Sequence, residues 1–344
     1  MLCLVSPEER VPKDHPLREI RRLADVALAT MSDGFDAIYA EAGRPSVPPE
    51  RLLKASLLIA LHSIRSERQF CEQLEYNLLF RWFLDMDMLE PAFDPTTFTK
   101  NRQRLMDADI AAEFFAAVRN QASDLMSREH FSVDGTLLEA WASMKSFRPK
   151  DEDGGDNNGW ADFRGHKRRN DTHESKTDPE ARLFRKSRGH EARLCFAGHA
   201  LVENRHGLLV DLRVSNATGF AERRTALEML EEHLRHGNTL GADRGYDTRG
   251  FVASCRERGV TPHVAQHRHA RRRSAIDGRT TRHVGYRISQ TIRMRIEQVF
   301  GWLKTVGGLR RTRFRGRRKT QFAAYLAGAA YNLLRVSRLR SCAS

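Results

Sequence analysis

Apolar residues recur at helical spacing through roughly the first 125 residues of the chain. Pro48 and Pro49 open one predicted helix, because proline fits the first turn of a helix. Ser66 and Gln69 form a capping box, and the helix that they open is predicted to run to Trp82. We therefore expect an all-helical N-terminal region.

A third predicted helix begins at Asp94 and Pro95 and carries Lys100, Arg102 and Arg104. The segment from Thr96 to Arg104 is a candidate recognition helix of a helix-turn-helix motif. A plain helical support domain is about equally favoured, because the helix-turn-helix has no sharp sequence signature. Both interpretations stay open.

Strand patterns replace the helical ones near His130. A first strand is predicted to end at Asp134, a hairpin covers 194–202 and 208–214, and short strands end at Asp243 and at Ala265. Helices are predicted over 221–236, 250–258, 287–304 and 321–338. Three strands, a helix and then alternating strands and helices predict an α/β fold, with a mixed sheet covered on both faces.

A polar stretch at about 143–190 interrupts this pattern. Its first part, residues 151–159, contains too few apolar residues to pack and is expected to be mobile. Because strand patterns resume afterwards, we interpret the stretch as an insertion inside a domain. The predicted organisation is thus a helical region over 1–125 and an α/β domain over 126–344.

Three carboxylates stand in well-marked contexts. Asp134 and Asp243 each close a predicted strand, and Glu297 lies in a helix-patterned segment. Two strand-end aspartates and a helical glutamate can gather on one face of a sheet, where such hard oxygen ligands suit Mg²⁺ or Mn²⁺. Two such ions can cut and rejoin phosphodiesters. Taken singly, either aspartate is better explained as a cap of the following turn.

The charge distribution points to a polyanion. The chain has 58 Lys and Arg residues against 44 Asp and Glu, a net charge of +14. Between Arg268 and Lys319, 17 basic residues stand against only Asp277 and Glu297. Phosphate contacts supply much of the affinity for nucleic acid, so DNA is the expected partner. A disordered basic tail is the alternative, but apolar residues keep helical spacing through this stretch.

Other polar residues complete the set of candidates. Arg293 and Lys304 flank Glu297 and are expected to bind phosphates; an ion pair between Arg293 and Glu297 is the alternative. Asp247 is predicted to cap a helix. The remaining expected contributors to DNA contact are the arginines Arg310, Arg311, Arg313 and Arg315, the histidines His263, His267 and His269, and Trp160 as a stacking residue, whereas Trp302 is expected in the core.

The five cysteines are scattered without a C-x-x-C pair, which argues against a disulfide framework or a zinc site. No run approaches 18 apolar residues, and the N-terminus lacks the pattern of a signal peptide. We expect a cytoplasmic, nucleoid-associated protein.

Three motifs in order carry a resemblance to a known family. The Asp-Gly-Thr at Asp134, the Ala-Asp-Arg-Gly-Tyr-Asp around Asp243, and the spacing of Arg293, Glu297 and Lys304 resemble those of bacterial insertion-sequence DDE transposases. In many relatives a tyrosine precedes this arginine by three residues; here the position holds Gln290. The likeness covers most of the chain.

The resemblance implies a ribonuclease H-like catalytic core in which Asp134, Asp243 and Glu297 hold divalent metal, Mg²⁺ or Mn²⁺. It implies binding of insertion-sequence ends, DNA strand cleavage and strand transfer, and we expect a homodimer in the active complex. The alternatives are a metal-dependent nuclease of the same fold without strand transfer, and a non-catalytic DNA-binding relative.

Overall fold

The computed structural model describes residues 6–36, 47–150, 168–185, 189–267 and 273–342, and the chain divides into two compact units. Residues 1–126, 302–308 and 325–344 form a helical unit; residues 127–301 and 309–324 form an α/β unit. These units describe packing, so the assignment of 1–125 to DNA binding and 126–344 to catalysis stays a prediction. No helix among the described residues is long and apolar enough to cross a membrane.

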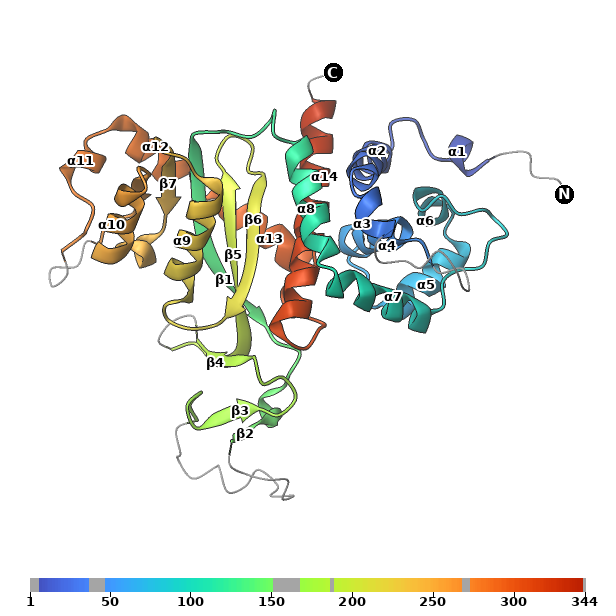
Figure 1. Cartoon of the computed structure of the whole chain (residues 1–344), viewed down its shortest axis with the longest axis horizontal. Coiled ribbons are helices and arrows are strands. Elements are labelled where there is room, and N and C mark those ends of the chain that lie inside the picture. The colour runs from blue at the N-terminus through green and yellow to red at the C-terminus, as the bar shows by residue number, and fades with distance from the viewer. Residues whose placement is uncertain (1–5, 37–46, 151–167, 186–188, 268–272, 343–344) are drawn as a thin grey trace. The chain divides into compact units, whose positions relative to one another are not determined.

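The helical unit consists mainly of short helices (Figure 1). They are α1 (Pro7–Arg10), α2 (Pro16–Ala29), α3 (Ser32–Asp36), α4 (Pro49–Leu61), α5 (Glu67–Tyr76), α6 (Leu78–Phe83), α7 (Pro95–Asp107) and α8 (Ile110–Gln121), with the later part of α14 (Arg317–Ser341). The predicted helix starts at Pro49, Ser66 and Asp94 are all present, and the side chains of Ser66 and Asp94 cap their helices. The predicted capping box is only half formed, because Gln69 Oε1 accepts the Arg65 amide instead of the Ser66 amide.

The helix predicted to run from the capping box to Trp82 is instead two helices. Asn77 ends α5, and its side-chain oxygen accepts the amides of Leu79 at 3.0 Å and Phe80 at 3.2 Å, which opens α6. The buried Arg81 side chain then donates to the carbonyls of Leu74, Asp87 and Glu90. A local cap and a buried guanidinium thus override continuous helical periodicity.

The α/β unit is built on a mixed sheet. Its strands and helices are β1 (His130–Glu139), β4 (Arg182–Phe184), β5 (Arg193–Glu203), β6 (Leu209–Asn216), α9 (Ala221–His233), β7 (Thr239–Ala242), α10 (Arg249–Glu257), β8 (Thr261–Val264), α11 (Gly278–Thr281), α12 (Val284–Ile292), α13 (Arg295–Thr305) and the start of α14. The polar insertion holds a small hairpin of β2 (Phe147–Pro149) and β3 (His173–Ser175) after a 3₁₀ turn at Met144–Ser146, while residues 151–167 lie outside the described part.

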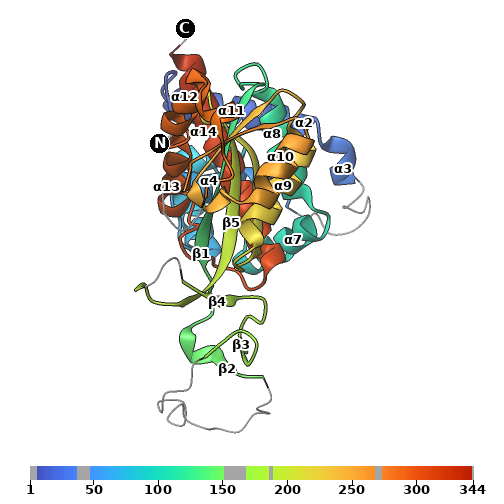
Figure 2. The ribbon, with the colours of Figure 1, turned by 90° about the vertical axis from the view of Figure 1, so that its left-hand side faces the viewer.

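The sheet order confirms the predicted fold class. β1 pairs antiparallel with β5 on one side and parallel with β7 on the other; β6 and the short β4 pair with β5, and β8 runs parallel to β7. Helix α9 packs on β5, β6 and β1, and α10 packs beside α9, as Figure 2 shows. Three antiparallel strands, a helix, and two parallel strands separated by a helix make the ribonuclease H-like core.

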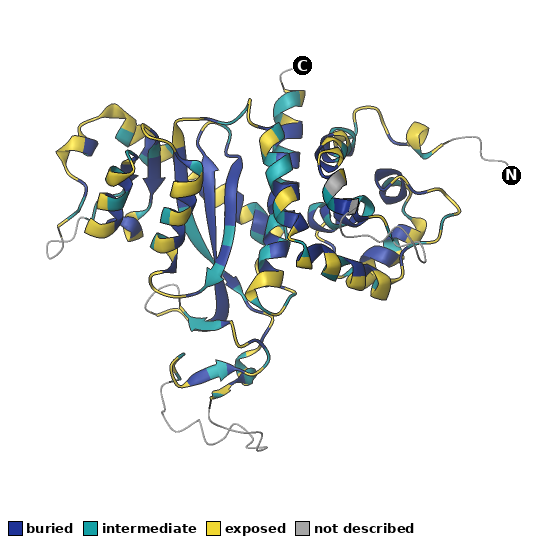
Figure 3. Ribbon diagram, in the orientation of Figure 1, coloured by how far each residue is buried: buried dark blue, intermediate teal, exposed yellow. Residues whose placement is uncertain are grey.

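Strand β1 continues five residues beyond Asp134, where the sequence predicted it to end. Its ladder with β5 runs from Phe131 opposite Glu203 to Glu139 opposite Cys195, so backbone hydrogen bonds carry the strand through Asp-Gly-Thr. Strand β5 itself is buried from Leu194 to Glu203 (Figure 3). Asp134 therefore lies within the central strand of the sheet.

A buried carboxylate holds the end of the β5–β6 hairpin. Glu203 is fully buried and accepts the amides of Ser127 at 3.0 Å, Arg205 at 2.7 Å, His206 at 2.7 Å and Leu208 at 3.0 Å. Since Ser127 precedes β1, this side chain fixes the start of β1 to the hairpin turn.

Candidate active site

The register of the sheet brings Asp134 and Asp243 together. Ser132 of β1 lies opposite Gly241 of the parallel strand β7. Asp134 stands two residues after Ser132, and Asp243 two residues after Gly241, so the two aspartates follow the same step along adjacent strands. Neighbouring strands lie about 4.8 Å apart, and residues two apart share a face. The predicted meeting of these two carboxylates therefore agrees with the strand register.

The environment of Asp134 disfavours its charge. Burial raises the pKa of Asp134 to about 7, against a hydrogen bond from the Gly135 amide at 2.8 Å. The negative charges of Asp243 and Glu222 raise this pKa further, and the Arg293 guanidinium opposes them. Crowded carboxylates of this kind are stabilised by a bound cation, which repays the repulsion between them.

Asp243 has the capping role, which was one of the two alternatives for it in the sequence. Its carboxylate accepts the Gly245 amide at 2.7 Å and so caps the 3₁₀ turn Arg244–Tyr246. A hydrogen bond to one oxygen leaves acceptor capacity on the carboxylate for other ligands. Capping therefore orients Asp243 beside Asp134 without consuming it.

The third carboxylate, Glu297, is exposed in the first turn of α13. The single helix predicted over 287–304 is broken, because α12 ends at Ile292 and α13 begins at Arg295. No proline or glycine causes this. On one side of the break, Gln290 Nε2 donates to the His263 carbonyl at 2.6 Å; on the other, Arg295 donates to the Asn204 carbonyl at 2.6 Å.

Gln290, at the position that holds tyrosine in many relatives, positions Arg293. Its Oε1 accepts the Nε of Arg293 at 3.3 Å while its amide nitrogen is held by β8. The alternative of an Arg293–Glu297 ion pair is not what the structure shows. Arg293 lies by β7, since its Cβ is 3.5 Å from a Cβ placed on Gly241.

The donor set fits a hard divalent cation. All three side chains offer carboxylate oxygens, the ligands that Mg²⁺ and Mn²⁺ prefer. Their ligand atoms do not all lie within 4.8 Å of one another; among the described residues, one group does so, Asp211, Glu232 and His233. Two ions about 4 Å apart need a wider ligand set than one ion does. The assignment of metal to Asp134, Asp243 and Glu297 stays a prediction.

The Asp211 group is better explained as an ion-pair network. Arg213 contacts Asp211 at 2.7 Å and Glu232 at 2.5 Å, and His233 lies 3.1 Å from Asp211. Burial raises the pKa of Asp211, but the His233 hydrogen bond and the Arg213 charge outweigh it, so this pKa lies below its usual range. The Arg213 guanidinium therefore already supplies the positive charge that these carboxylates need.

The basic segment after α13 is largely exposed. Arg310, Arg313 and Arg315 are exposed in residues 309–316. The guanidinium of Arg311 instead donates to the carbonyls of Ala140 at 3.2 Å and Trp141 at 2.9 Å. Arg311 therefore anchors its loop to the end of β1. The DNA contacts predicted for these four arginines, and for Arg293 and Lys304, remain predictions.

Several smaller predictions meet a different outcome. Asp247 does not cap α10, because Thr248 does; the Asp247 carboxylate accepts the amides of His267 at 2.7 Å and Ala275 at 2.8 Å. His263 is buried rather than part of an exposed patch, and burial lowers its pKa to about 4. Trp302, which was expected in the core, is half-buried and packs edge-on against Tyr331. His269 and Trp160 lie outside the described residues.

Two residues near the aspartates escaped the sequence analysis. Glu222 opens α9, and Tyr246 is buried in the turn after Asp243. Tyr246 belongs to the Ala-Asp-Arg-Gly-Tyr-Asp motif, but Glu222 had no local signal beyond its place at a helix start.

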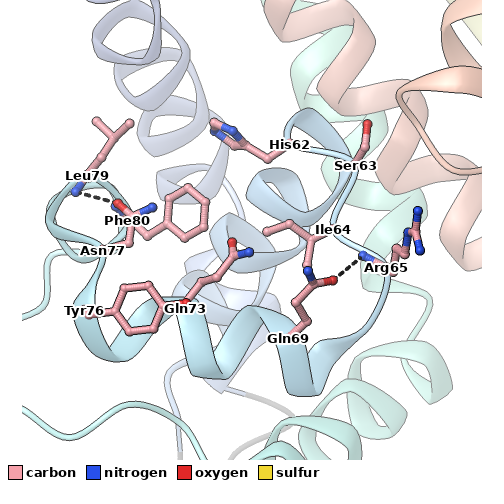
Figure 4. A pocket seen from close by; sticks show the side chains of 10 residues that line it. All are labelled: His62, Ser63, Ile64, Arg65, Gln69, Gln73, Tyr76, Asn77, Leu79 and Phe80. Atoms are coloured by element: carbon pink, nitrogen blue, oxygen red, sulfur yellow. Dashed lines mark hydrogen bonds between the residues drawn. The ribbon is translucent and has the colours of Figure 1, made fainter.

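The helical unit has an open pocket of about 440 Å³ of its own (Figure 4). Polar side chains line much of it, including Arg65, Gln69, Gln73 and Tyr76, and the Arg65 amide donates to Gln69 Oε1 at 3.2 Å. Amide and guanidinium groups can hydrogen-bond base edges. Sequence reasoning had placed the candidate DNA contacts of this unit on α7 alone.

The raised pKa of Asp134 predicts that Asp134→Asn stabilises the metal-free protein. A carboxyl whose pKa is higher in the folded state adds stability at low pH, which is lost as pH rises toward about 7. At pH 8 the variant should be more stable by on the order of 1 to 3 kcal/mol, with the difference vanishing by pH 4. Thermal unfolding in chelator across this pH range measures it, and a constant difference would contradict it.

Comparison of the sequence with known protein families finds two matches. Residues 159–333 match the family described as "Transposase DDE domain", and residues 5–104 match "Transposase domain (DUF772)". The comparison with curated proteins finds no match. A solved piggyBac transposase synaptic complex with hairpin DNA is 9% identical, with 95% of this chain and 76% of that chain covered and a TM-score of 0.44. A Mos1 transposase paired-end complex with left transposon end is 9% identical, with 90% and 85% covered and a TM-score of 0.21.

Proposed function

Because the chain belongs to the DDE transposase family, we propose that it binds insertion-sequence ends and catalyses DNA strand cleavage followed by strand transfer. The observation that carries the proposal is the approach of Asp134, on β1, to Asp243, which follows the adjacent parallel strand β7, where burial raises the pKa of Asp134 to about 7. Such a perturbed carboxylate marks a functional site.

The residues of the chain suggest how the site works. Members of the family use a divalent metal, which when bound polarises the scissile phosphate; Mg²⁺ fits the oxygen donors here, and Mn²⁺ can replace it. Asp134, Asp243 and Glu297 would hold it. Arg293, oriented by Gln290, would bind a phosphate beside the cut. Water first breaks a phosphodiester bond and leaves a 3′-hydroxyl. This hydroxyl then attacks a phosphorus of target DNA, which forms the new phosphodiester bond, breaks one in the target and releases the target's 3′-hydroxyl.

The cleavage assay that tests this function separates it from a nuclease of the same fold. The full chain is incubated with inverted-repeat DNA, target plasmid and Mg²⁺, and the cut and joined strands are mapped. Transposition predicts nicks at the repeat ends and joined products. Cuts without joining would establish the nuclease, and binding without cuts would establish the non-catalytic relative. Because two ends must be joined, we also propose a homodimer in the active complex.

Neutralising the exposed arginines should weaken DNA binding regardless of sequence. The change is Arg310, Arg313 and Arg315 to alanine together, with Arg311 kept because it anchors its loop. Fewer released counterions should make the slope of log affinity against log salt shallower by up to about 3. A matched triple variant on the α9–α10 side, Arg224, Arg235 and Arg258 to alanine, should keep the wild-type slope. An unchanged slope in the first variant would place its arginines away from DNA.

Sequence recognition should instead depend on the helical unit. Lys100 and Arg104 are exposed on α7, whereas Arg102 is ion-paired with Glu67. Replacing Lys100 and Arg104 with alanine should lower the preference for inverted-repeat over scrambled DNA by about tenfold or more, since one base contact contributes about 1 to 3 kcal/mol. Competition binding measures the preference, with Arg10→Ala/Lys13→Ala as control. An equal loss of affinity for inverted-repeat and scrambled DNA would show that α7 contacts only the DNA backbone.

A further inference from the structure

The first turn of α9 packs against the glycine that follows Asp134. A Cβ added at Gly135 would lie 2.7 Å from Oε1 of Glu222 and 2.8 Å from its Cγ. Any side chain at residue 135 would therefore displace the Glu222 carboxyl group. The glycine of the Asp-Gly-Thr motif is thus explained by the glutamate that occupies this space, and not by an unusual backbone angle.

The same helical turn is tied to the loop that carries Asp243. Arg223 Nη1 donates to the Gly245 carbonyl at 3.2 Å, and Nη2 donates to the Gly219 carbonyl at 3.3 Å. These bonds fix the start of α9 against the turn that Asp243 caps. Glu222 is exposed, and its charge reaches Asp134.

A second, independent observation comes from Tyr246. Its side chain is 1% exposed, and its hydroxyl has no hydrogen-bond partner among the described residues. The charges of Asp134, Glu222 and Asp243 act on this hydroxyl and, with burial, raise the pKa of Tyr246 well above its usual value. Tyr246 is thus a buried donor on whose hydroxyl the charges of three carboxylates act. A buried donor without a partner costs about 1 to 3 kcal/mol, unless a ligand supplies one.

We propose that Glu222 is a fourth carboxylate of the metal site and binds divalent metal together with Asp134 and Asp243. This inference rests on the proposed function and extends its ligand set. The helix dipole also stabilises a negatively charged glutamate in the first turn of a helix. That role alone would not require the side chain to lie against Gly135, and it leaves the buried Tyr246 hydroxyl without a partner.

Metal binding tests the proposal without relying on catalysis. Mn²⁺ binding to the full chain is measured by calorimetry and by electron paramagnetic resonance of the free ion. Glu222→Gln should weaken binding by about 10- to 100-fold, the size of effect that loss of a supporting group has at metal sites. Glu222→Asp, which keeps the charge, should recover part of it. Glu231→Gln, a 69% exposed side chain on the same helix, should bind as the wild type does.

Thermal unfolding and DNA affinity serve as controls for correct folding, and Glu222→Gln should leave both near their wild-type values. Gly135→Ala supplies a second route, because the added methyl displaces the same carboxylate and should weaken Mn²⁺ binding similarly. Wild-type Mn²⁺ affinity in Glu222→Gln, with weakened binding in Asp134→Asn, would overturn this inference and leave the proposed function standing. No Mn²⁺ binding by the wild-type chain would overturn both.

Discussion

Replacing Asp134 or Asp243 with asparagine, or Glu297 with glutamine, is expected to abolish DNA strand cleavage. Each change removes one negative ligand and keeps the side-chain shape. Metal ions contribute several kcal/mol to the transition state, and each 1.4 kcal/mol is a factor of ten, so a loss of about 10³-fold or more is expected. DNA binding should be largely retained, because the phosphate contacts are expected from basic residues and not from these carboxylates.

The measurement is nicking of labelled inverted-repeat DNA beside band shifts for each variant. Glu191→Gln, whose side chain is 71% exposed, provides the matched control and should cut as the wild type does. Cleavage at the wild-type rate by any one of the three variants would remove that residue from the site.

The largest effect on stability is expected from Glu203→Gln. Four backbone amides donate to the two carboxylate oxygens of the buried Glu203, and the glutamine replaces one oxygen with an NH₂ group that faces donors. Hydrogen bonds to a charged group contribute about 1.5 to 3 kcal/mol each, and removing one side of such a set typically costs about 3 to 5 kcal/mol in total.

For a domain of 150 to 250 residues, that loss corresponds to a fall in Tm of about 6 to 20 °C. Thermal unfolding followed by circular dichroism measures it. Glu129→Gln is the control, because its side chain is 78% exposed and nearby in the sequence. A fall in Tm of less than about 2 °C would mean that water replaces the lost acceptor.

The order of strands and helices could be predicted because each local pattern agreed with its neighbours. The apolar run at Leu194–Val202 and the polar turn after it predict the β5–β6 hairpin. The approach of Asp134 to Asp243 follows once β1 and β7 are placed as adjacent parallel strands. Element ends were less predictable. Tertiary hydrogen bonds decide them, as where the ladder to β5 extends β1 beyond Asp134.

Residues that act through distant contacts could not be predicted. Nothing in the sequence around Glu222 reveals that it will lie against Gly135, because that contact depends on how α9 crosses the sheet. Likewise the break between α12 and α13 comes from bonds to His263 and Asn204, which are remote in sequence. Helical periodicity predicts a helix but not where its partners will interrupt it.

Asp134 lies on the central strand of the sheet, so its backbone is expected to be more rigid than that of Glu297. Opening β1 at this residue would break its ladder to β5, so it requires unfolding most of the sheet. Glu297 follows a helix break, where the amides of Ile296 and Glu297 bond to carbonyls only three residues back, at Arg293 and Met294. We therefore expect the aspartates of the proposed site to be held as rigidly as the sheet, and Glu297 to adjust locally when DNA binds.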